Sequence, residues 1–237
     1  MEDFDFHWTL VKKELANYLG REIQDDKELL RIENEIDNTW YLTGEKNFSI
    51  YNDTKYLMIA YCCFKKYSRG FMLRSLPIVE EMCPRTILDV GAGIGATTAM
   101  LANKFKSSKC YYQNLPGEQF NFAKCLLRQF NNVEFINSVD TLKSIDLVVC
   151  LELFEHIKSP IDLLDRLIGL DPKIFIISNS FGAKAFGHFS KYTVLDEEIL
   201  SNKMPRIFNR YLKSRNYSID LRSKNFWNSR PTIWIKD

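Results

Sequence analysis

Apolar residues in the first third of the chain recur at intervals of three and four, which is the spacing of one face of an α-helix. The pattern predicts a first helix that ends before Gly20, and further helices over 56–64 and 71–82. A second helical face is expected from Leu29 to Ile36, and a turn-rich aromatic segment over 40–51. We therefore expect residues 1–82 to form a helical cap or lid over a larger domain at 83–237. Alternatively, these helices only cover one edge of a sheet.

From residue 86 onward the pattern changes to short apolar runs that alternate with amphipathic segments. Strands are predicted at 87–90, 109–113, 133–136, 145–150 and 173–178, with helices between them at 97–105, 118–130 and 160–170. The run Leu147–Cys150 is apolar throughout, as in a strand that is buried on both faces. Such alternation predicts an α/β fold with a mostly parallel sheet between two layers of helices.

The last part of the chain has a different order of elements. Residues 182–192 are expected to form a loop rich in glycine and aromatic side chains, and a helical region is expected to follow through Tyr211. Two strands are predicted at 217–221 and 232–235, joined by a loop that contains Asn228 and Pro231. Their short separation predicts an antiparallel C-terminal hairpin.

Composition and charge exclude several classes of protein. A net charge of +2 and the absence of a basic stripe give no indication of a nucleic-acid partner. No apolar run is long enough to span a membrane, and the acidic start Met1–Asp5 is unlike a secretion signal, so we expect a cytoplasmic protein. The six cysteines contain no Cys-x-x-Cys pair and are expected to be reduced. No cluster of acids or histidines has ligand spacing, so no metal is expected, although a site built from ligands dispersed along the chain stays open.

The most informative stretch is Asp89-Val90-Gly91-Ala92-Gly93-Ile94-Gly95, where a buried strand runs into alternating glycines. Glycines at this place allow a tight turn in which the backbone approaches a ligand. The spacing fits a loose dinucleotide fingerprint and also the glycine motif of S-adenosylmethionine enzymes. A dinucleotide enzyme needs an acid near position 114 for the ribose, and this chain has Asn114. Asp89 would attract a methionine ammonium and repel a pyrophosphate, although it could also cap the turn.

With these residues the chain resembles the class I S-adenosylmethionine-dependent methyltransferases, in particular small-molecule enzymes of the sugar O-methyltransferase type. The resemblance rests on Ile87–Gly95, Asn114–Pro116, Asp140 and Asp146–Ile157, and on the C-terminal hairpin. It implies a Rossmann-like sandwich around a seven-stranded sheet, with S-adenosyl-L-methionine as cofactor. By position it assigns the cofactor to nine residues, from the methionine end to the reactive methyl: Asp89, Gly91, Ala92, Gly93, Asn114, Leu115, Asp140, Cys150 and Leu151.

The acceptor is expected to be a small polar molecule, with a sugar or nucleotide-linked sugar hydroxyl favoured by loose similarity to bacterial sugar O-methyltransferases of polysaccharide biosynthesis. A hydroxyl must lose a proton, and the candidate catalytic residues are His188, His156 and Glu152, with Glu155 as an orienting residue. His156 could also be a packed structural histidine.

Other readings of the sequence stay open. They are N-methylation of another metabolite, a non-catalytic cofactor-binding subunit and a nicotinamide enzyme. The segment Cys150–Leu153 lacks the Asn-Pro-Pro-Tyr type of motif that holds an extruded base, so nucleic-acid methylation is disfavoured. The expected partners are the acceptor and, in a homodimer, a second copy of the chain.

Overall fold

A seven-stranded sheet in the order β3-β2-β1-β4-β5-β9-β8 forms the centre of the computed structural model, which describes residues 2–23, 51–224 and 232–237. Four parallel pairings join β1, β2, β3, β4 and β5, whereas β9 runs antiparallel to both β5 and β8. This sheet confirms the predicted α/β fold and the C-terminal hairpin. The strands are β1 (Thr86–Val90), β2 (Lys109–Gln113), β3 (Val133–Ile136), β4 (Leu147–Leu151), β5 (Ile174–Ser178), β8 (Tyr217–Ile219) and β9 (Ile233–Lys236).

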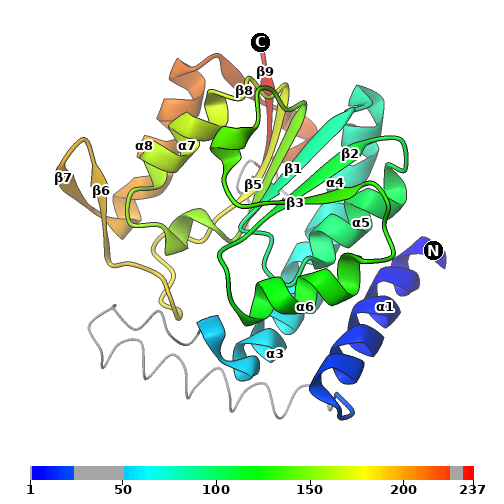
Figure 1. Ribbon diagram of the computed structural model, residues 1–237. Coiled ribbons are helices and arrows are strands. Elements are labelled where there is room, and N and C mark those ends of the chain that lie inside the picture. The colour runs from blue at the N-terminus through cyan, green and yellow to red at the C-terminus, as the bar shows by residue number, and fades with distance from the viewer. Residues whose placement is uncertain (1, 24–50, 225–231) are drawn as a thin grey trace.

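Helices cover both faces of the sheet and complete a three-layer sandwich (Figure 1). Helices α5 (Ala96–Lys104) and α6 (Glu118–Leu127) lie on one side, and α7 (Pro160–Ile168) and α8 (Met204–Ser214) lie on the other. Both faces of the central strands are therefore covered, and every residue of β5 is buried. This explains why the central strands are continuous apolar runs rather than alternating ones. Among the described residues, none of the helices has the length and apolar character that crossing a bilayer requires.

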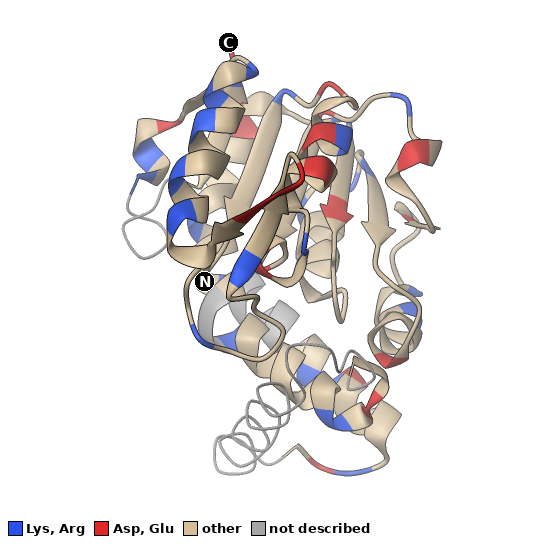
Figure 2. Ribbon diagram, turned by 90° about the vertical axis from the view of Figure 1, so that its left-hand side faces the viewer, with Lys and Arg blue, Asp and Glu red and all other residues tan. Residues whose placement is uncertain are grey.

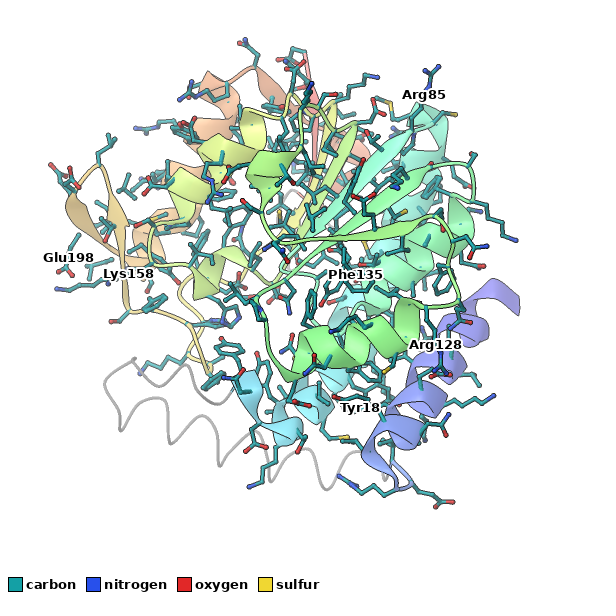
Figure 3. All side chains as sticks on the ribbon, viewed as in Figure 1. Tyr18, Arg85, Arg128, Phe135, Lys158 and Glu198 are labelled. Carbon is teal, nitrogen blue, oxygen red and sulfur yellow. The ribbon has the colours of Figure 1, made fainter. Side chains whose placement is uncertain are left out.

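The N-terminal residues are helical, as predicted. Helix α1 (Glu2–Leu19) ends before Gly20, and α3 (Thr54–Cys63) continues through a π-helical turn η2 (Phe64–Ser68) into α4 (Arg69–Met82). Helix α1 packs on α6, where the Tyr18 hydroxyl donates to Glu118 Oε2 at 2.9 Å and Arg128 pairs with Glu14 at 3.4 Å (Figure 3). The features expected over 29–36 and 40–50, and the loop residues Asn228 and Pro231, lie outside the described residues.

A second small sheet replaces part of the helix that was expected after residue 192. Strands β6 (Lys191–Val194) and β7 (Glu197–Leu200) form an antiparallel hairpin, and the helical region begins only with η5 (Ser201–Lys203) and α8. The turn residues Leu195 and Asp196 have φ values of +48° and +62°. Positive φ at both central residues is the geometry of a tight hairpin turn, usually adopted by Asn-Gly or Asp-Gly, so this turn lacks the usual sequence signal.

Candidate functional site

The glycine loop lies at the carboxyl end of β1, in the middle of the sheet. Gly91 and Gly93 have φ values of +63° and +54°, which a residue with a side chain adopts only at a cost. The loop is tied to β2, because the Ala92 N–H donates to the Gln113 carbonyl at 3.0 Å and the Tyr112 hydroxyl donates to the Gly93 carbonyl at 2.7 Å. A Cβ atom on Gly91 would overlap the Leu153 side chain. The backbone of this turn is therefore fixed before any ligand binds.

Asp89 is buried beneath this loop and is only 3% exposed. Its Oδ2 accepts a hydrogen bond of 2.6 Å from the Thr98 hydroxyl on α5. Burial raises the pKa of Asp89 to about 7, and the hydrogen bonds from Thr98 oppose that rise. The Asp89 carboxyl thus fixes the first turn of α5 against β1. This is a structural role of the kind that the sequence analysis considered beside contact with the cofactor.

The residues expected at the ribose and adenine follow β2. Asn114 is half-buried, and Leu115 is 76% exposed, although it is a large apolar side chain. An apolar side chain exposed next to a glycine loop provides a surface on which a planar base could pack.

Asp140 lies in η3 (Val139–Thr141), which follows β3, and its carboxylate is engaged with other side chains. It accepts bonds of 2.5 and 3.1 Å from Arg166 and a bond of 2.8 Å from the Ser138 hydroxyl. These hydrogen bonds lower its pKa, with Arg166 the larger cause. The structure therefore places the residue predicted for the adenine amine in an exposed ion pair.

At the carboxyl end of β4, Cys150 is fully buried and Leu151 is half-buried. Burial raises the pKa of the Cys150 thiol well above its usual value, so this cysteine is an inert part of the core. Any contact of Cys150 with a ligand is therefore expected through its backbone rather than its sulfur.

Two glutamates follow β4 and are held by the loop after β5. Glu152 has a φ of +49°, a left-handed conformation that costs a non-glycine residue about 1 kcal/mol or more and is found most often at functional sites. The Ser180 hydroxyl donates to Glu152 Oε2 at 2.8 Å, and the Ser180 N–H donates to Glu155 Oε1 at 2.7 Å. One serine therefore fixes both carboxyl groups.

The remaining carboxyl oxygens, Glu152 Oε1 and Glu155 Oε2, are buried without a hydrogen-bond partner. Burial, reinforced by the neighbouring Glu152, raises the pKa of Glu155 well above its usual value. A buried acceptor without a donor is destabilising unless a proton or cation reaches it. The two glutamates are thus prepared to receive positive charge.

Two histidines complete this group. The rings of His156, in η4 (Phe154–His156), and His188 meet edge to face with centroids 4.7 Å apart. His188 Nδ1 lies 3.0 Å from the Ala183 carbonyl oxygen. Because a carbonyl only accepts, we assign the ring hydrogen to Nδ1 and the lone pair to Nε2. Burial, with a smaller effect from His188, lowers the pKa of His156 to about 3, so this ring is neutral at neutral pH.

We call Glu152, Glu155, His156 and His188 the acid–histidine cluster. One potential ligand atom from each of Glu155, His156 and His188 lies within 4.8 Å of the other two. No such spacing is visible in the sequence, because His188 comes from a different loop. The three residues are dispersed ligands of the kind that the sequence left open. Tyr51, which sequence reasoning did not select, also reaches this cluster: its hydroxyl lies 3.1 Å from His156 Nδ1.

Comparison with known proteins adds a family match over the same elements. Residues 88–169, from β1 to the end of α7, match a family model described as a methyltransferase domain. A search of the curated proteins finds no significant match.

Solved structures share the fold at low sequence identity. The methyltransferase domain of bacterial CtHen1-CN has a TM-score of 0.51 and 14% identity, covering 71% of this chain and 97% of that one. Magnesium protoporphyrin IX methyltransferase (ChlM) from Synechocystis PCC 6803, solved with bound SAM, has a TM-score of 0.50 and 16% identity, covering 91% and 100%. The match to EvdMO1, with a TM-score of 0.47 and 20% identity, covers 62% of this chain and spans 35% of that chain's length.

The matched domain contains the glycine loop and both glutamates, and it lies within a sheet of the expected order. We conclude that the chain contains a methyltransferase domain over residues 88–169 and shares a Rossmann-like fold with solved methyltransferases.

Proposed function

We propose that the chain methylates a hydroxyl group of a small polar acceptor, and that this acceptor is a sugar or a nucleotide-linked sugar. The observation that carries the proposal is the acid–histidine cluster, which gathers four groups able to take up a proton or a cation at the carboxyl ends of β4 and β5. A hydroxyl must lose its proton to be methylated. A neutral amine is a better nucleophile than a neutral hydroxyl and can attack before it loses a proton, so a cluster of proton acceptors favours oxygen over nitrogen as the acceptor atom.

The cofactor has a fitting set of residues along the ends of β1 and β2. We assign the methionine end to the loop Gly91–Gly93 above Asp89, the ribose to Asn114 and the adenine to the exposed side chain of Leu115. Contact of the adenine amine with Asp140 would require this carboxylate to be shared with Arg166. When bound, the cofactor supplies a methyl group that its positive sulfur has already activated.

The protein must then align the acceptor and remove its proton. His188 presents its lone-pair nitrogen Nε2 when Nδ1 donates to Ala183, and His156 is neutral at neutral pH because its pKa is low. Glu152, held by Ser180, is the third candidate. The proximity of His156 and His188 to Glu155, and the hydrogen bond from Ser180 to Glu152, support this proposed catalytic role.

A basic helix supports an anionic acceptor such as a nucleotide-linked sugar. Lys and Arg recur along α8 (Figure 2). Among them, Arg206, Arg210 and Lys213 are exposed. The residues just before α8 approach the loop that carries His188, because a Cβ atom on Gly182 would lie 3.7 Å from the Asn202 Cα. Positive charge near the entrance of a site raises the local concentration of anionic substrates.

The test is methyl transfer from isotopically labelled S-adenosylmethionine to separate pools of sugars, nucleotide sugars, amines, RNA and protein. We expect O-linked label in the sugar or nucleotide-sugar pool. Label found only in amines, RNA or protein would overturn the proposal, and binding of S-adenosylhomocysteine without transfer to any pool would favour a non-catalytic subunit. The E198Q variant is the control. Glu198 lies on the exposed strand β7 and pairs with Lys191 of β6 and with Lys158, which precedes α7 (Figure 3).

A further inference from the structure

We propose that the acid–histidine cluster binds one divalent cation. The role of this cation, which rests on the proposed function, is to hold the acceptor hydroxyl. The four side chains come from two loops, one after β4 and one after β5. They supply two imidazole nitrogens and two carboxylates, which is a donor set typical of metal sites in enzymes.

The spacing of the cluster suits a single ion. Nitrogen and oxygen ligands lie about 2.0–2.2 Å from a transition-metal ion, so two ligands of one ion are separated by about 3–4.3 Å. The potential ligand atoms of Glu155, His156 and His188 lie within 4.8 Å of one another. Side-chain movements of about half an ångström would therefore bring all three into contact with one cation.

The unsatisfied carboxyl oxygens provide an independent observation. Glu155 is 0% exposed, and its Oε2 has no hydrogen-bond partner, while Oε1 is held by the Ser180 N–H. Glu152 repeats the arrangement, with Oε2 held by the Ser180 hydroxyl and Oε1 buried without a partner. Leaving such an acceptor unsatisfied costs about 1–3 kcal/mol, and more when it is charged. A cation would satisfy both oxygens at once.

The surroundings of the histidines resemble the outer shell of a metal site. A metal-binding imidazole usually donates its other N–H to a carbonyl or carboxylate, which fixes the ring and its tautomer. His188 has this arrangement, with Nδ1 against the Ala183 carbonyl, so Nε2 is its ligand atom. The Tyr51 hydroxyl contacts Nδ1 of His156 and would orient that second ring.

The donor set also indicates the class of metal. Imidazole ligands suit Fe²⁺ and Zn²⁺, and carboxylates suit Mn²⁺, so this mixed donor set fits a first-row transition-metal ion better than Mg²⁺ or Ca²⁺, which prefer oxygen alone. A hydroxyl bound to such an ion releases its proton more readily, and the proton passes to solvent. With the ion bound, the two histidines hold it in position, and they then do not act as the bases considered under the proposed function.

Manganese binding to the full chain tests this site directly. After removal of metal with a chelator, Mn²⁺ is titrated into the wild type, E155Q, H188N and the surface control E198Q, and bound Mn²⁺ is measured by electron paramagnetic resonance. E155Q is informative because the Gln carbonyl can still accept the Ser180 N–H. S-adenosylhomocysteine binding, measured on each variant, shows that it is folded.

We expect one tight Mn²⁺ per chain in the wild type and in E198Q, and binding weakened by about 100-fold or more in E155Q and H188N. No saturable Mn²⁺ or Zn²⁺ binding, or equal binding in folded E155Q and H188N, would overturn the cation site. Hydroxyl methylation that persists after complete chelation would overturn the role of the ion while leaving the proposed function intact. Cation binding without methylation of any hydroxyl would instead refute the proposed function and leave the cation site standing.

Discussion

The Tyr51 hydroxyl lies 3.1 Å from Nδ1 of His156, so a residue ahead of α3 forms part of the site. Tyr51 also packs against Phe186, with ring centroids 5.2 Å apart. Gly187, at a φ of +76°, has no room for a Cβ atom between Tyr51 and His156. This contact between the N-terminal part and the loop after β5 supports the interpretation of residues 1–82 as a cap that reaches the site.

Removing the Tyr51 hydroxyl tests this relationship. We predict that Y51F lowers kcat about tenfold, because His156 loses the contact that orients it, and lowers stability by about 0.5–1.5 kcal/mol. Methylation rates and denaturant unfolding measure the two effects. Y211F is the matched control, since it removes an exposed hydroxyl that donates to Asp165 at 2.7 Å on α7. An unchanged kcat in Y51F would show that the contact is only structural.

Alanine in the glycine loop is expected to weaken cofactor binding. In G91A the new methyl group would overlap the Leu153 side chain. Holding alanine at a φ of +63° would also destabilise the loop by about 1–2 kcal/mol. Calorimetry with S-adenosylhomocysteine should show binding weakened by at least about tenfold. G70A provides the control: Gly70 lies in α4 with open space around it, so alanine should stabilise the helix by about 1 kcal/mol and leave binding unchanged. Wild-type affinity in G91A would contradict the assignment of this loop.

Asp89 makes stability depend on pH. Its pKa is raised by burial from 3.8 to about 7, so the folded chain retains a proton that the unfolded chain releases above about pH 4. The free energy of unfolding therefore falls as the pH rises from about 4 to about 7, by up to about 1.4 kcal/mol per pH unit. Above about pH 7 Asp89 is ionised in both states, and its contribution no longer changes.

D89N isolates this effect, because asparagine can still accept the Thr98 hydroxyl but does not ionise. Denaturant unfolding at several pH values should show a smaller decline for D89N than for the wild type across this window. Identical pH profiles would mean that Asp89 titrates normally in the folded chain.

Asn114 tests where the ribose binds. In N114D a carboxylate replaces the amide and can accept from both hydroxyls of the ribose, so S-adenosylhomocysteine should bind as tightly as in the wild type or more tightly. Calorimetry decides the direction. N121D, on the exposed side of α6, should leave the affinity unchanged. Markedly weaker binding in N114D alone would show that this strand end does not hold the ribose.

Most of the fold could be predicted because its strands are buried on both faces. Leu147, Val148 and Val149 are all 0% exposed in β4, so their uninterrupted apolar run was sufficient to locate the strand. The β6–β7 hairpin could not be located in this way, because Leu195 and Asp196 form its turn without glycine. The spacing of Leu195, Ile199 and Leu200 also fits a helical face.

The individual site residues could be proposed from the sequence, but their convergence could not. Glu155 and His156 are adjacent in the chain, whereas His188 joins them only because the loop after β5 folds back over the end of β4, with the Phe189 N–H bonded to the Glu155 carbonyl at 3.4 Å. The role of Asp140 illustrates the opposite case. Its spacing agrees with the family pattern, yet its carboxylate pairs with Arg166 on α7, a partner that no local pattern indicates.

A crystal structure of the complex with S-adenosylhomocysteine tests the central claim most directly. We expect the ligand to lie across the ends of β1 and β2, with its adenine near Leu115 and its sulfur facing the acid–histidine cluster. Such a placement would put the methyl group next to an acceptor held at Glu152 and His188. A sulfur that faces away from this cluster, or a cofactor bound elsewhere on the sheet, would contradict it.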